Sequence, residues 1–534
     1  MIELNEKILV SGNEAIAAAA FDGNVLFASG YPGTPSSEIL EYFSLLGGNA
    51  EWAPNEKIAM EVATGAAYGR ARAMVTMKHV GLNVAADPFF TSAYTGVDGA
   101  LVIISADDPG MASSQNEQDN RNYAKAAGIP MLEPSDSQEA YDFMLNALEM
   151  SEKWQIPVML RVTTRICHSR SSLKRIPEKK KTPNPVFIKD PKSKVLIPAN
   201  AIPAHLRLRE KLSQIAESNE TSPLNFIRRK SGEFGIITSG ISYMHAIEAV
   251  PDATILKLGT TYPLPNELIS SFVKSVKKCL ILEEGDPFLY ESIRAEGNEV
   301  ENKPETFRFG ELNVNRVKKI VRGDLSPDPK LPPGKPPQLC PGCPHRDVFD
   351  VLKKLNAIVA GDIGCYSLGV LPPYEAMDTC LCMGAGIGVG LGLRHVLPEE
   401  QAKKVVSIIG DSTFVHSGIT GIIEMVYNPP KSGHVVIIVD NETTAMTGLQ
   451  EHPGTGRALD HKPAPSISLE KIVRATGIEN VFVVNPTLER EKLEQLVEDS
   501  LAKEELTVII AKRPCVLALK ALRKFNNTEP GRNN

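Results

Sequence analysis

KVVSIIGD (404–411) and HVVIIVDNET (434–443) decide the fold of this chain, because each is a run of apolar, mostly β-branched residues that ends on polar groups. Such runs are typical of strands buried on both faces of a parallel sheet. The interval between them, about thirty residues, is the length of a helical crossover. Since the carboxyl ends of neighbouring parallel strands share one edge of the sheet, we expect Asp411 and Asn441 to lie close together.

The same alternation of strands and helices runs through the rest of the chain and predicts an α/β fold built on parallel sheets. Buried strands are expected at NVLFASG (24–30), RAMVTMKHV (72–80), GALVIISAD (99–107), IPVMLRVTT (156–164), GEFGIITSG (232–240), ATILKLG (253–259) and KCLILEE (278–284). We predict a first domain over 1–195, a linker or insertion over 196–230, a smaller domain over 231–325, a proline-rich linker over 326–338, a third domain over 339–522 and a disordered tail over 523–534.

Composition excludes several classes of protein. The net charge of −6 argues against a general nucleic-acid binder. The sequence contains no run of eighteen apolar residues, so no membrane span is expected. The N-terminus is acidic and does not resemble a signal peptide. With no export signal, the eight cysteines are expected to be thiols or metal ligands, and the protein to be cytoplasmic.

The strand tips carry the chemistry of a divalent-cation site. A small, hard cation prefers oxygen ligands and commonly bridges to phosphates, and Asp411, the amide oxygen of Asn441 and the backbone carbonyl of Thr443 meet that need. Gly410 permits close approach of a diphosphate, and the glycine-rich helix that Gly384 opens can direct N–H groups at an anion. An ordinary strand-to-helix turn remains the alternative for Gly410-Asp411 taken alone.

Four cysteines fit an iron–sulfur centre. Cys340 and Cys343 form a Cys-x2-Cys pair, and Cys365 and Cys515 are single cysteines further along the chain. A [4Fe-4S] cluster needs four thiolates, which a short pair and two distant cysteines supply if the fold brings them together. Zinc, or a turn with free thiols, remains open, and Cys380 and Cys382 are possible substitutes.

Longer stretches resemble one family. GNEAIAAAAFDGNVLFASGYPGTPSSEI (12–39), MKHVGLNVAADPFFTSAYTGV (77–97), DDPGMASSQNEQDNR (107–121), LRVTTRICHS (160–169), GDSTFVHSGITGIIEMVYN (410–428) and DNETTAMTGLQEHPGTG (440–456) are similar to the alpha subunits of indolepyruvate ferredoxin oxidoreductases. The resemblance implies a pyrimidine-binding domain, a transketolase-C-like domain and a diphosphate-binding domain, in that order. It also implies thiamine diphosphate and Mg²⁺ as cofactors, and the same four-cysteine pattern for the cluster.

The family also implies an activating glutamate, nine residues before a Gly-Ala-Ala step. Glu56 stands nine residues before Gly65 and is our choice over Glu61, which is expected to be a charge on a helix face. A helix-dipole role is the alternative for Glu56. The resemblance places Thr34 near the cofactor or substrate. Ser412 follows the predicted ligand Asp411 and His416 lies shortly after it, so both are candidates for the cofactor site. His79 and Asn83 are weaker pocket candidates.

The expected activity is oxidative decarboxylation of a 2-oxo acid, by resemblance an arylpyruvate, with transfer of the acyl group to coenzyme A. The family implies a smaller beta-type partner subunit, ferredoxin or a ferredoxin-like carrier as electron acceptor, and a dimer of heterodimers. The sequence departs from the family in one respect. Typical members end with a ferredoxin-like module that carries two Cys-x2-Cys-x2-Cys-x3-Cys-Pro runs, and these runs are absent from this sequence. A non-oxidative thiamine-dependent decarboxylase or carboligase, and a non-enzymatic subunit, are the alternatives.

Overall fold

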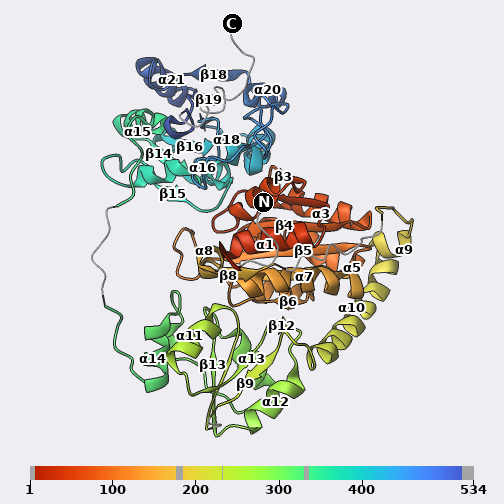
Figure 1. Cartoon of the computed structure of the whole chain (residues 1–534). Helices are drawn as coiled ribbons and strands as arrows, with labels where there is room; N and C mark the ends of the chain where they lie inside the picture. The colour runs from red at the N-terminus through yellow and green to blue at the C-terminus, as the bar shows by residue number, and fades with distance from the viewer. Residues whose placement is uncertain (1–6, 176–183, 231–232, 330–335, 520–534) are drawn as a thin grey trace. The chain divides into compact units, whose positions relative to one another are not determined.

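The computed structural model describes residues 7–175, 184–230, 233–329 and 336–519 (Figure 1). The chain divides into two compact units, Met1–Lys330 and Leu331–Asn534. The predicted tail, and part of the predicted proline-rich linker, lie outside the described residues. Among the described residues, no helix combines the length and the apolar character that a membrane span requires.

The first unit is built on a seven-stranded sheet of order β12-β6-β7-β5-β4-β2-β3. All neighbours are parallel except β12 and β6. The strands are β2 (Phe27–Gly30), β3 (Ala50–Trp52), β4 (Arg72–Lys78), β5 (Ala100–Asp107), β6 (Met131–Leu132), β7 (Val158–Thr163) and β12 (Thr260–Tyr262). Two further strands, β1 (Lys7–Ser11) and β8 (Arg170–Lys174), form a separate antiparallel pair. The apolar runs predicted as buried strands in this region are therefore strands of one sheet.

Helices connect these strands, as a parallel sheet requires. They are α1 (Gly12–Asp22), α2 (Ser37–Leu45), α3 (Glu56–Tyr68), α4 (Gly81–Val84), α5 (Ala86–Thr95), α6 (Arg121–Ala127), α7 (Ser137–Trp154) and α8 (Thr164–His168). The helix α3 begins where Asn55 accepts a hydrogen bond from the N–H of Ile58 at 2.9 Å, which satisfies a free donor of the first turn. This cap sets Glu56 as the first helical residue.

A second sheet of order β13-β10-β11-β9 completes the first unit. Its strands are β9 (Phe226–Arg228), β10 (Phe234–Thr238), β11 (Thr254–Lys257) and β13 (Lys278–Leu282), and its helices are α11 (Ile241–Ala249), α12 (Asn266–Lys274), α13 (Phe288–Ala295) and α14 (Val314–Arg322). The strand β12 leaves this region of the sequence to join the first sheet. The first sheet therefore includes a strand that lies, in the sequence, between strands of the second.

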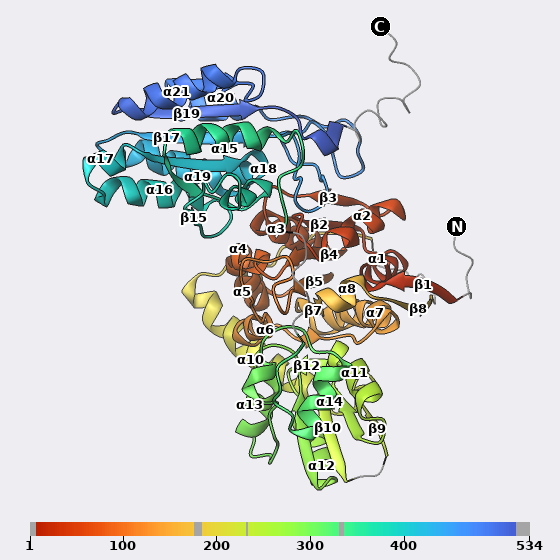
Figure 2. The ribbon, with the colours of Figure 1, turned by 90° about the vertical axis from the view of Figure 1, so that its left-hand side faces the viewer.

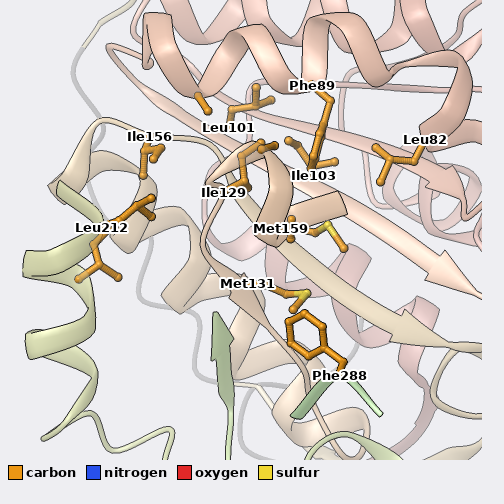
Figure 3. Close-up of a cluster of buried hydrophobic side chains, with 14 of the residues drawn as sticks. Leu82, Phe89, Leu101, Ile103, Ile129, Met131, Ile156, Met159, Leu212 and Phe288 are labelled. Carbon is orange, nitrogen blue, oxygen red and sulfur yellow. The ribbon is translucent and has the colours of Figure 1, made fainter. Parts of the chain in front are cut away.

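Residues 196–230, predicted to be a linker or insertion, contribute to the packed structure. They form the long helix α10 (Pro198–Asn219), preceded by the short α9 (Pro191–Lys194), and then β9. Leu208, Leu212 and Ile215 of α10 belong to a large buried cluster with residues of both sheets (Figure 3). Burial of such a side chain stabilises the fold by about 1.5–3 kcal/mol. The sequence of 205–219 is amphipathic, but such a pattern does not reveal which surface the helix covers.

Buried ion pairs also join the two sheets of the first unit. Arg121 donates to Glu283 at 2.6 Å and to Asp119 at 2.6 Å, and all three side chains are almost fully buried. Lys257 of β11 donates to Glu139 of α7 at 2.7 Å. Because a buried charge that loses its partner is costly, these pairs make the contact between the sheets depend on complementary charge.

The second unit contains one six-stranded parallel sheet of order β15-β14-β16-β17-β19-β18. Its strands are β14 (Ile358–Gly361), β15 (Thr379–Cys380), β16 (Val405–Gly410), β17 (His434–Asp440), β18 (Asn480–Val484) and β19 (Leu506–Lys512). The two strands from which the fold was predicted, β16 and β17, are neighbours, with Gly410 paired to Val439.

Helices cover both faces of this sheet (Figure 2). On one face α15 (Pro344–Lys354) and α21 (Arg490–Ala502) pack against a cluster that includes Val406, Val435 and Ile437. On the other face α16 (Ala385–Val396), α19 (Ile419–Tyr427) and α20 (Leu469–Ala475) pack against residues such as Val436 and Ile438. Alternate residues of β17 thus enter different cores, which explains why its sequence is apolar throughout.

Candidate active site

The carboxyl edge of the sheet in the second unit collects the residues that the sequence singled out there. Asp411 follows β16, Asn441 and Thr443 follow β17, Cys365 follows β14, and Cys515 follows β19. Ligand sites of open parallel sheets form at this edge. The order of the strands thus brings together groups that are separated by more than a hundred residues in the sequence.

The turns after β16 and β17 contact each other directly. Thr444 Oγ1 donates to Ser412 Oγ at 2.8 Å, and Asp411 Oδ2 lies 3.1 Å from His452 Nε2. Asp411 Oδ1 accepts from the N–H of Ser412 at 2.9 Å. The Asp411 carboxylate is buried, and both of its oxygens are engaged by groups of the two turns.

A second carboxylate lies beside the first. Burial, together with the negative charge of Asp411, raises the pKa of Asp440 to about 6. Burial alone would also raise the pKa of Asp411, but its contacts with His452 and Ser412 outweigh that effect and hold this pKa below its usual value. Two adjacent buried carboxylates favour a proton or a cation between them, so the site has the charge that a divalent cation would balance.

Asn441 is held by three contacts. Its Oδ1 accepts from the N–H of Thr443 at 3.2 Å, and its Nδ2 lies 3.3 Å from Nε2 of His345. Its backbone carbonyl accepts from the N–H of Cys515 at 2.9 Å. Burial lowers the pKa of His345 to about 4, so this imidazole is neutral at pH 7. The donor set of Asp411 and Asn441 is oxygen-rich and fits a magnesium ion.

Two predicted glycines have different neighbours from those we expected. A Cβ on Gly410 would lie 2.7 Å from the ring of Tyr366, so the missing side chain makes room for that ring. The N–H groups of Gly384 and Gly386 both donate to the Asp362 carboxylate at 2.9 Å. Burial raises the pKa of Asp362 to about 6. A protein carboxylate thus occupies the amides that we predicted for a diphosphate, and a role for Gly384 toward a cofactor stays a prediction.

Four cysteines gather at the same edge of the sheet. Burial, reinforced by the mutual repulsion of Cys340, Cys343, Cys365 and Cys515, raises the pKa of Cys365 to about 12, and burial raises that of Cys343 to about 11. A Cβ on Gly342, between the first two cysteines, would lie 3.7 Å from the side chain of Val516, the residue after Cys515. Thiols grouped in this way ionise together only if positive charge is supplied, as an iron–sulfur cluster does.

The arrangement of these thiols matters for the type of metal centre. Within the described ranges, no group of three histidine, cysteine, aspartate or glutamate side chains surrounds a point where one metal ion would sit. A cubane takes one cysteine on each of its irons, whereas zinc needs several ligands around one point. The cluster and zinc both stay predictions.

Cys380 and Cys382 are both exposed, and they lie elsewhere along the edge. Cys380 Sγ donates to the carbonyl of Asp362 at 3.5 Å. Partial desolvation of the two thiols raises the pKa of each, and the negative charge of Asp362 contributes to both shifts. A role for Cys380 or Cys382 as a substitute for a member of the four-cysteine group stays a prediction.

In the first unit, the residues predicted for the pyrimidine end of a cofactor also share one edge. Thr34 lies in the loop after β2, Glu56 follows β3, and Gly81 follows β4, all neighbouring parallel strands. Glu56 is buried, and a Cβ on Gly81 would lie only 2.5 Å from its Oε1. Glu61, in contrast, is exposed and pairs with Lys57 on the surface of α3. The choice of Glu56 is consistent with its burial.

His79 and His416 are buried, whereas Asn83 is exposed, and these three candidates differ in their contacts. His79 Nε2 lies 3.2 Å from the carbonyl of Asn116, and its Nδ1 has no hydrogen-bond partner among the described residues. His416 Nδ1 lies 2.5 Å from Ser417 Oγ. Asn83 exchanges hydrogen bonds with Gln118 at 3.0 and 2.9 Å. A cavity of about 320 Å³ opens beside Thr443 and is lined by Gly448, Gln450, Arg457 and His461 among others.

Sequence reasoning missed four residues of this site: Asp362, Asp440, His345 and His452. Asp440 stood next to a predicted ligand, and the polar strand end was a usable signal. His345 stood beside the cysteine pair, but only the fold brings it to Asn441. No local pattern distinguished Asp362 or His452.

Two family models match the chain. Residues 18–212 match "Pyruvate flavodoxin/ferredoxin oxidoreductase, thiamine diP-bdg", and residues 362–511 match "Thiamine pyrophosphate enzyme, C-terminal TPP binding domain". Together with the parallel sheets and the groups at their carboxyl edges, these matches define the class: the chain is part of a thiamine-diphosphate-dependent 2-oxoacid oxidoreductase.

Full-length relatives identify the family within that class. The indolepyruvate oxidoreductase subunit IorA of Archaeoglobus fulgidus is 41% identical over 97% of this chain and 88% of its own length. The subunit of the same name from Pyrococcus horikoshii is 39% identical over 96% of this chain and 86% of its own length. This chain belongs to the IorA family of indolepyruvate oxidoreductase alpha subunits.

A solved structure shares the fold. A 2-oxoglutarate:ferredoxin oxidoreductase from Magnetococcus marinus, with 2-oxoglutarate, coenzyme A and succinyl-CoA bound, superposes with a TM-score of 0.51 at 17% identity. The alignment covers 60% of this chain and 66% of that chain. The solved structure confirms the predicted fold class. The names of the relatives imply that the family consists of subunits of multi-subunit oxidoreductases.

Proposed function

We propose that this chain is the catalytic subunit that oxidatively decarboxylates an arylpyruvate, with indolepyruvate as the first substrate to test, and forms an acyl-coenzyme A. Its cofactors are thiamine diphosphate with Mg²⁺ and one [4Fe-4S] cluster. The observation that carries the proposal is Asn441, whose side chain belongs to the oxygen-rich group around Asp411 and whose carbonyl binds the N–H of Cys515. The groups suited to the two inorganic centres are thus neighbours.

The chain's own residues divide the work. Asp411, Asn441 and the carbonyl of Thr443 would hold the magnesium ion that binds the diphosphate. Glu56, packed against Gly81, would hold a proton at the distal nitrogen of the pyrimidine ring. Thr34 would orient the substrate or the ring. When bound, thiamine diphosphate supplies a carbon nucleophile and an electron sink.

The four-cysteine group would carry electrons away from the reaction. Cys340, Cys343, Cys365 and Cys515 would each bind one iron of the cluster. The relatives are named as subunits, which supports the presence of a partner subunit. We propose a smaller beta-type chain as this partner, a ferredoxin or ferredoxin-like protein as the acceptor and a dimer of heterodimers as the assembly. All eight cysteines are free thiols, which supports a reducing, cytoplasmic location.

Anaerobic purification of the chain with its partner subunit tests the proposal. Iron, sulfide and thiamine are determined, and turnover of a panel of 2-oxo acids is measured with coenzyme A and a viologen dye. We expect about four irons per chain, dependence on thiamine diphosphate and Mg²⁺, and reduction of the dye fastest with arylpyruvates.

Other outcomes would select another function. A protein that lacks iron but releases carbon dioxide from a 2-oxo acid would be a non-oxidative decarboxylase or carboligase. A folded protein that binds no thiamine diphosphate in the presence of Mg²⁺ would be a non-catalytic subunit. Faster turnover of a small aliphatic or dicarboxylic 2-oxo acid would replace the arylpyruvate as substrate.

A further inference from the structure

Two buried histidines contact the two side chains that would bind the cation. His452 Nε2 lies 3.1 Å from Oδ2 of Asp411, and His345 Nε2 lies 3.3 Å from Nδ2 of Asn441. The exposed fractions are 6% for His452 and 2% for His345, so water does not compete freely for either contact. The proposed chemistry gives neither residue a role.

The direction of the hydrogen bond at His452 follows from its other nitrogen. Nδ1 of His452 accepts from the N–H of Gly454 at 3.2 Å, so this nitrogen carries no proton. The ring proton of the neutral imidazole is therefore on Nε2 and is donated to Asp411. Since Ser412 donates its N–H to the other oxygen, the plane of the Asp411 carboxylate is held from both sides.

At His345 the direction is reversed. The N–H of Thr443 needs an acceptor, and it finds Oδ1 of Asn441 at 3.2 Å, so the NH₂ group of Asn441 faces His345. An amide NH₂ group can only donate, and Nε2 of His345 must therefore accept. This imidazole holds the amide in the orientation that leaves Oδ1 turned away from the ring.

We propose that His452 and His345 are positioning residues that orient Asp411 and Asn441 for the divalent cation, the first as a hydrogen-bond donor and the second as an acceptor. This inference rests on the proposed function, because it assigns the two histidines to the same cation site. Partners of metal ligands restrict the rotamers of those ligands before the metal binds, and their loss typically costs 10–100-fold in metal affinity. The cation site thus extends to two residues that bind no metal.

Calorimetric titration of Mg²⁺ into protein saturated with thiamine diphosphate tests this. Four variants are compared with the wild type: His452→Leu, His452→Gln, His345→Leu and His345→Gln. Leucine removes the hydrogen bond at similar volume, whereas the amide of glutamine can donate at 452 and accept at 345. We expect about 10–100-fold weaker Mg²⁺ binding in the leucine variants and a largely restored affinity in the glutamine variants.

His395→Leu is the matched control. His395 lies in the same unit, exposed in the last turn of α16, and the proposed cation site does not include it. Its Mg²⁺ affinity should equal that of the wild type. Circular dichroism of the cofactor-free variants checks the fold, and if a leucine variant lacks a cooperative unfolding transition, serine, which is too short to reach the ligand, replaces it with the same expected loss.

Two failures can be told apart. If the wild type binds thiamine diphosphate and Mg²⁺ but the leucine or serine variants bind Mg²⁺ equally well, the positioning role is refuted and the proposed function stands. If glutamine is as harmful as leucine, hydrogen bonding is not what the histidines contribute, and the inference is also refuted. If the wild type itself shows no Mg²⁺-dependent binding of thiamine diphosphate, the proposed function fails and this inference fails with it.

Discussion

Glu56 occupies the space that a side chain on Gly81 would fill: a Cβ there would lie 2.5 Å from Oε1 and 2.8 Å from Cγ of the glutamate. The contact joins the first residue of α3 to the first residue of α4, at the ends of two strands of one sheet. The position of the carboxyl group therefore depends on a residue 25 positions later in the sequence.

Gly81→Ala should displace this carboxyl group and lower turnover by about 100-fold, because small misplacements of a catalytic group have effects of that size. Release of carbon dioxide from the 2-oxo acid measures it. Gly65→Ala is the control, since a Cβ at Gly65 meets nothing within 4 Å and the helix should tolerate it. Wild-type turnover in Gly81→Ala would show that the location of the Glu56 carboxyl is unimportant.

Glu56→Gln should lower turnover by about 100- to 10,000-fold, the usual range for loss of a general acid or base. Thiamine diphosphate binding, measured by calorimetry, should change much less. The exposed Glu61 supplies the control: Glu61→Gln loses one surface pair with Lys57 and should keep full activity. If instead Glu61→Gln were inactive and Glu56→Gln active, the assignment of the activating carboxyl would move to Glu61.

Cys343→Ser should lose most of the iron and sulfide of the purified protein, because three thiolates hold a four-iron cluster less firmly than four. Metal analysis after anaerobic purification measures the loss. Cys382→Ser is the matched control, as Cys382 is exposed and outside the four-cysteine group. An unchanged iron content in Cys343→Ser, or a loss in Cys382→Ser, would require a different set of ligands.

Arg121→Met should destabilise the first unit by about 3–5 kcal/mol, because it removes the guanidinium group that pairs with the buried carboxylates of Asp119 and Glu283. Both tryptophans, Trp52 and Trp154, lie in this unit, so urea denaturation followed by their fluorescence reports on it.

The control for Arg121→Met is Arg308→Met, because Arg308 is half exposed and pairs with Asp286. Loss of an exposed pair should cost no more than about 1 kcal/mol. Equal losses of stability in the two variants would mean that the buried ion pairs add nothing specific to the contact between the sheets.

Glu284 should make the stability of the first unit depend on pH. Burial raises the pKa of this carboxyl to about 7 from its ordinary value of 4.5. Between these values the unfolded chain ionises while the folded one keeps its proton, so this group lowers stability as pH rises from about 5 to about 7, with no further change above. The total effect is at most about 3 kcal/mol.

Glu284→Gln should remove the part of the pH dependence of stability that this carboxyl group causes. The tryptophan signal then gives a free energy of unfolding that exceeds the wild-type value more at pH 8 than at pH 5, and the growth of the difference isolates Glu284 from other titrating groups. A difference between variant and wild type that does not grow with pH would contradict the prediction.

Much of the fold could be predicted because its strands are apolar on both faces. β16 and β17 ended where the polar residues of 411 and 441 began, and neighbouring parallel strands follow from a crossover of that length. The role of α10 could not be predicted, since an amphipathic pattern indicates that one face is buried but not which surface covers it. The same holds for β12, whose three residues join a sheet formed by distant parts of the sequence.

The site was predictable only in part, for a similar reason. Asp411 and Asn441 end conspicuous strands, whereas His452 lies in an irregular loop and Asp362 follows a four-residue strand with a weak pattern. The expected diphosphate contact at Gly384 illustrates the limit: the glycine-rich helix start was recognised, but the carboxylate of Asp362, which follows β14, accepts the hydrogen bond from its amide. Hydrogen bonds between distant loops leave no periodic trace in a sequence.

The bond from the Cys515 N–H to the Asn441 carbonyl has a consequence for maturation. The segment that carries the Cys515 thiol is hydrogen-bonded to the backbone of Asn441, a residue suited to bind the cation. Ordering either segment therefore also orders the other. Under the proposed function, whichever inorganic centre binds first would therefore prepare the site of the second. Biogenesis of the holoenzyme should accordingly be cooperative, with half-loaded chains scarce when both metals are in short supply.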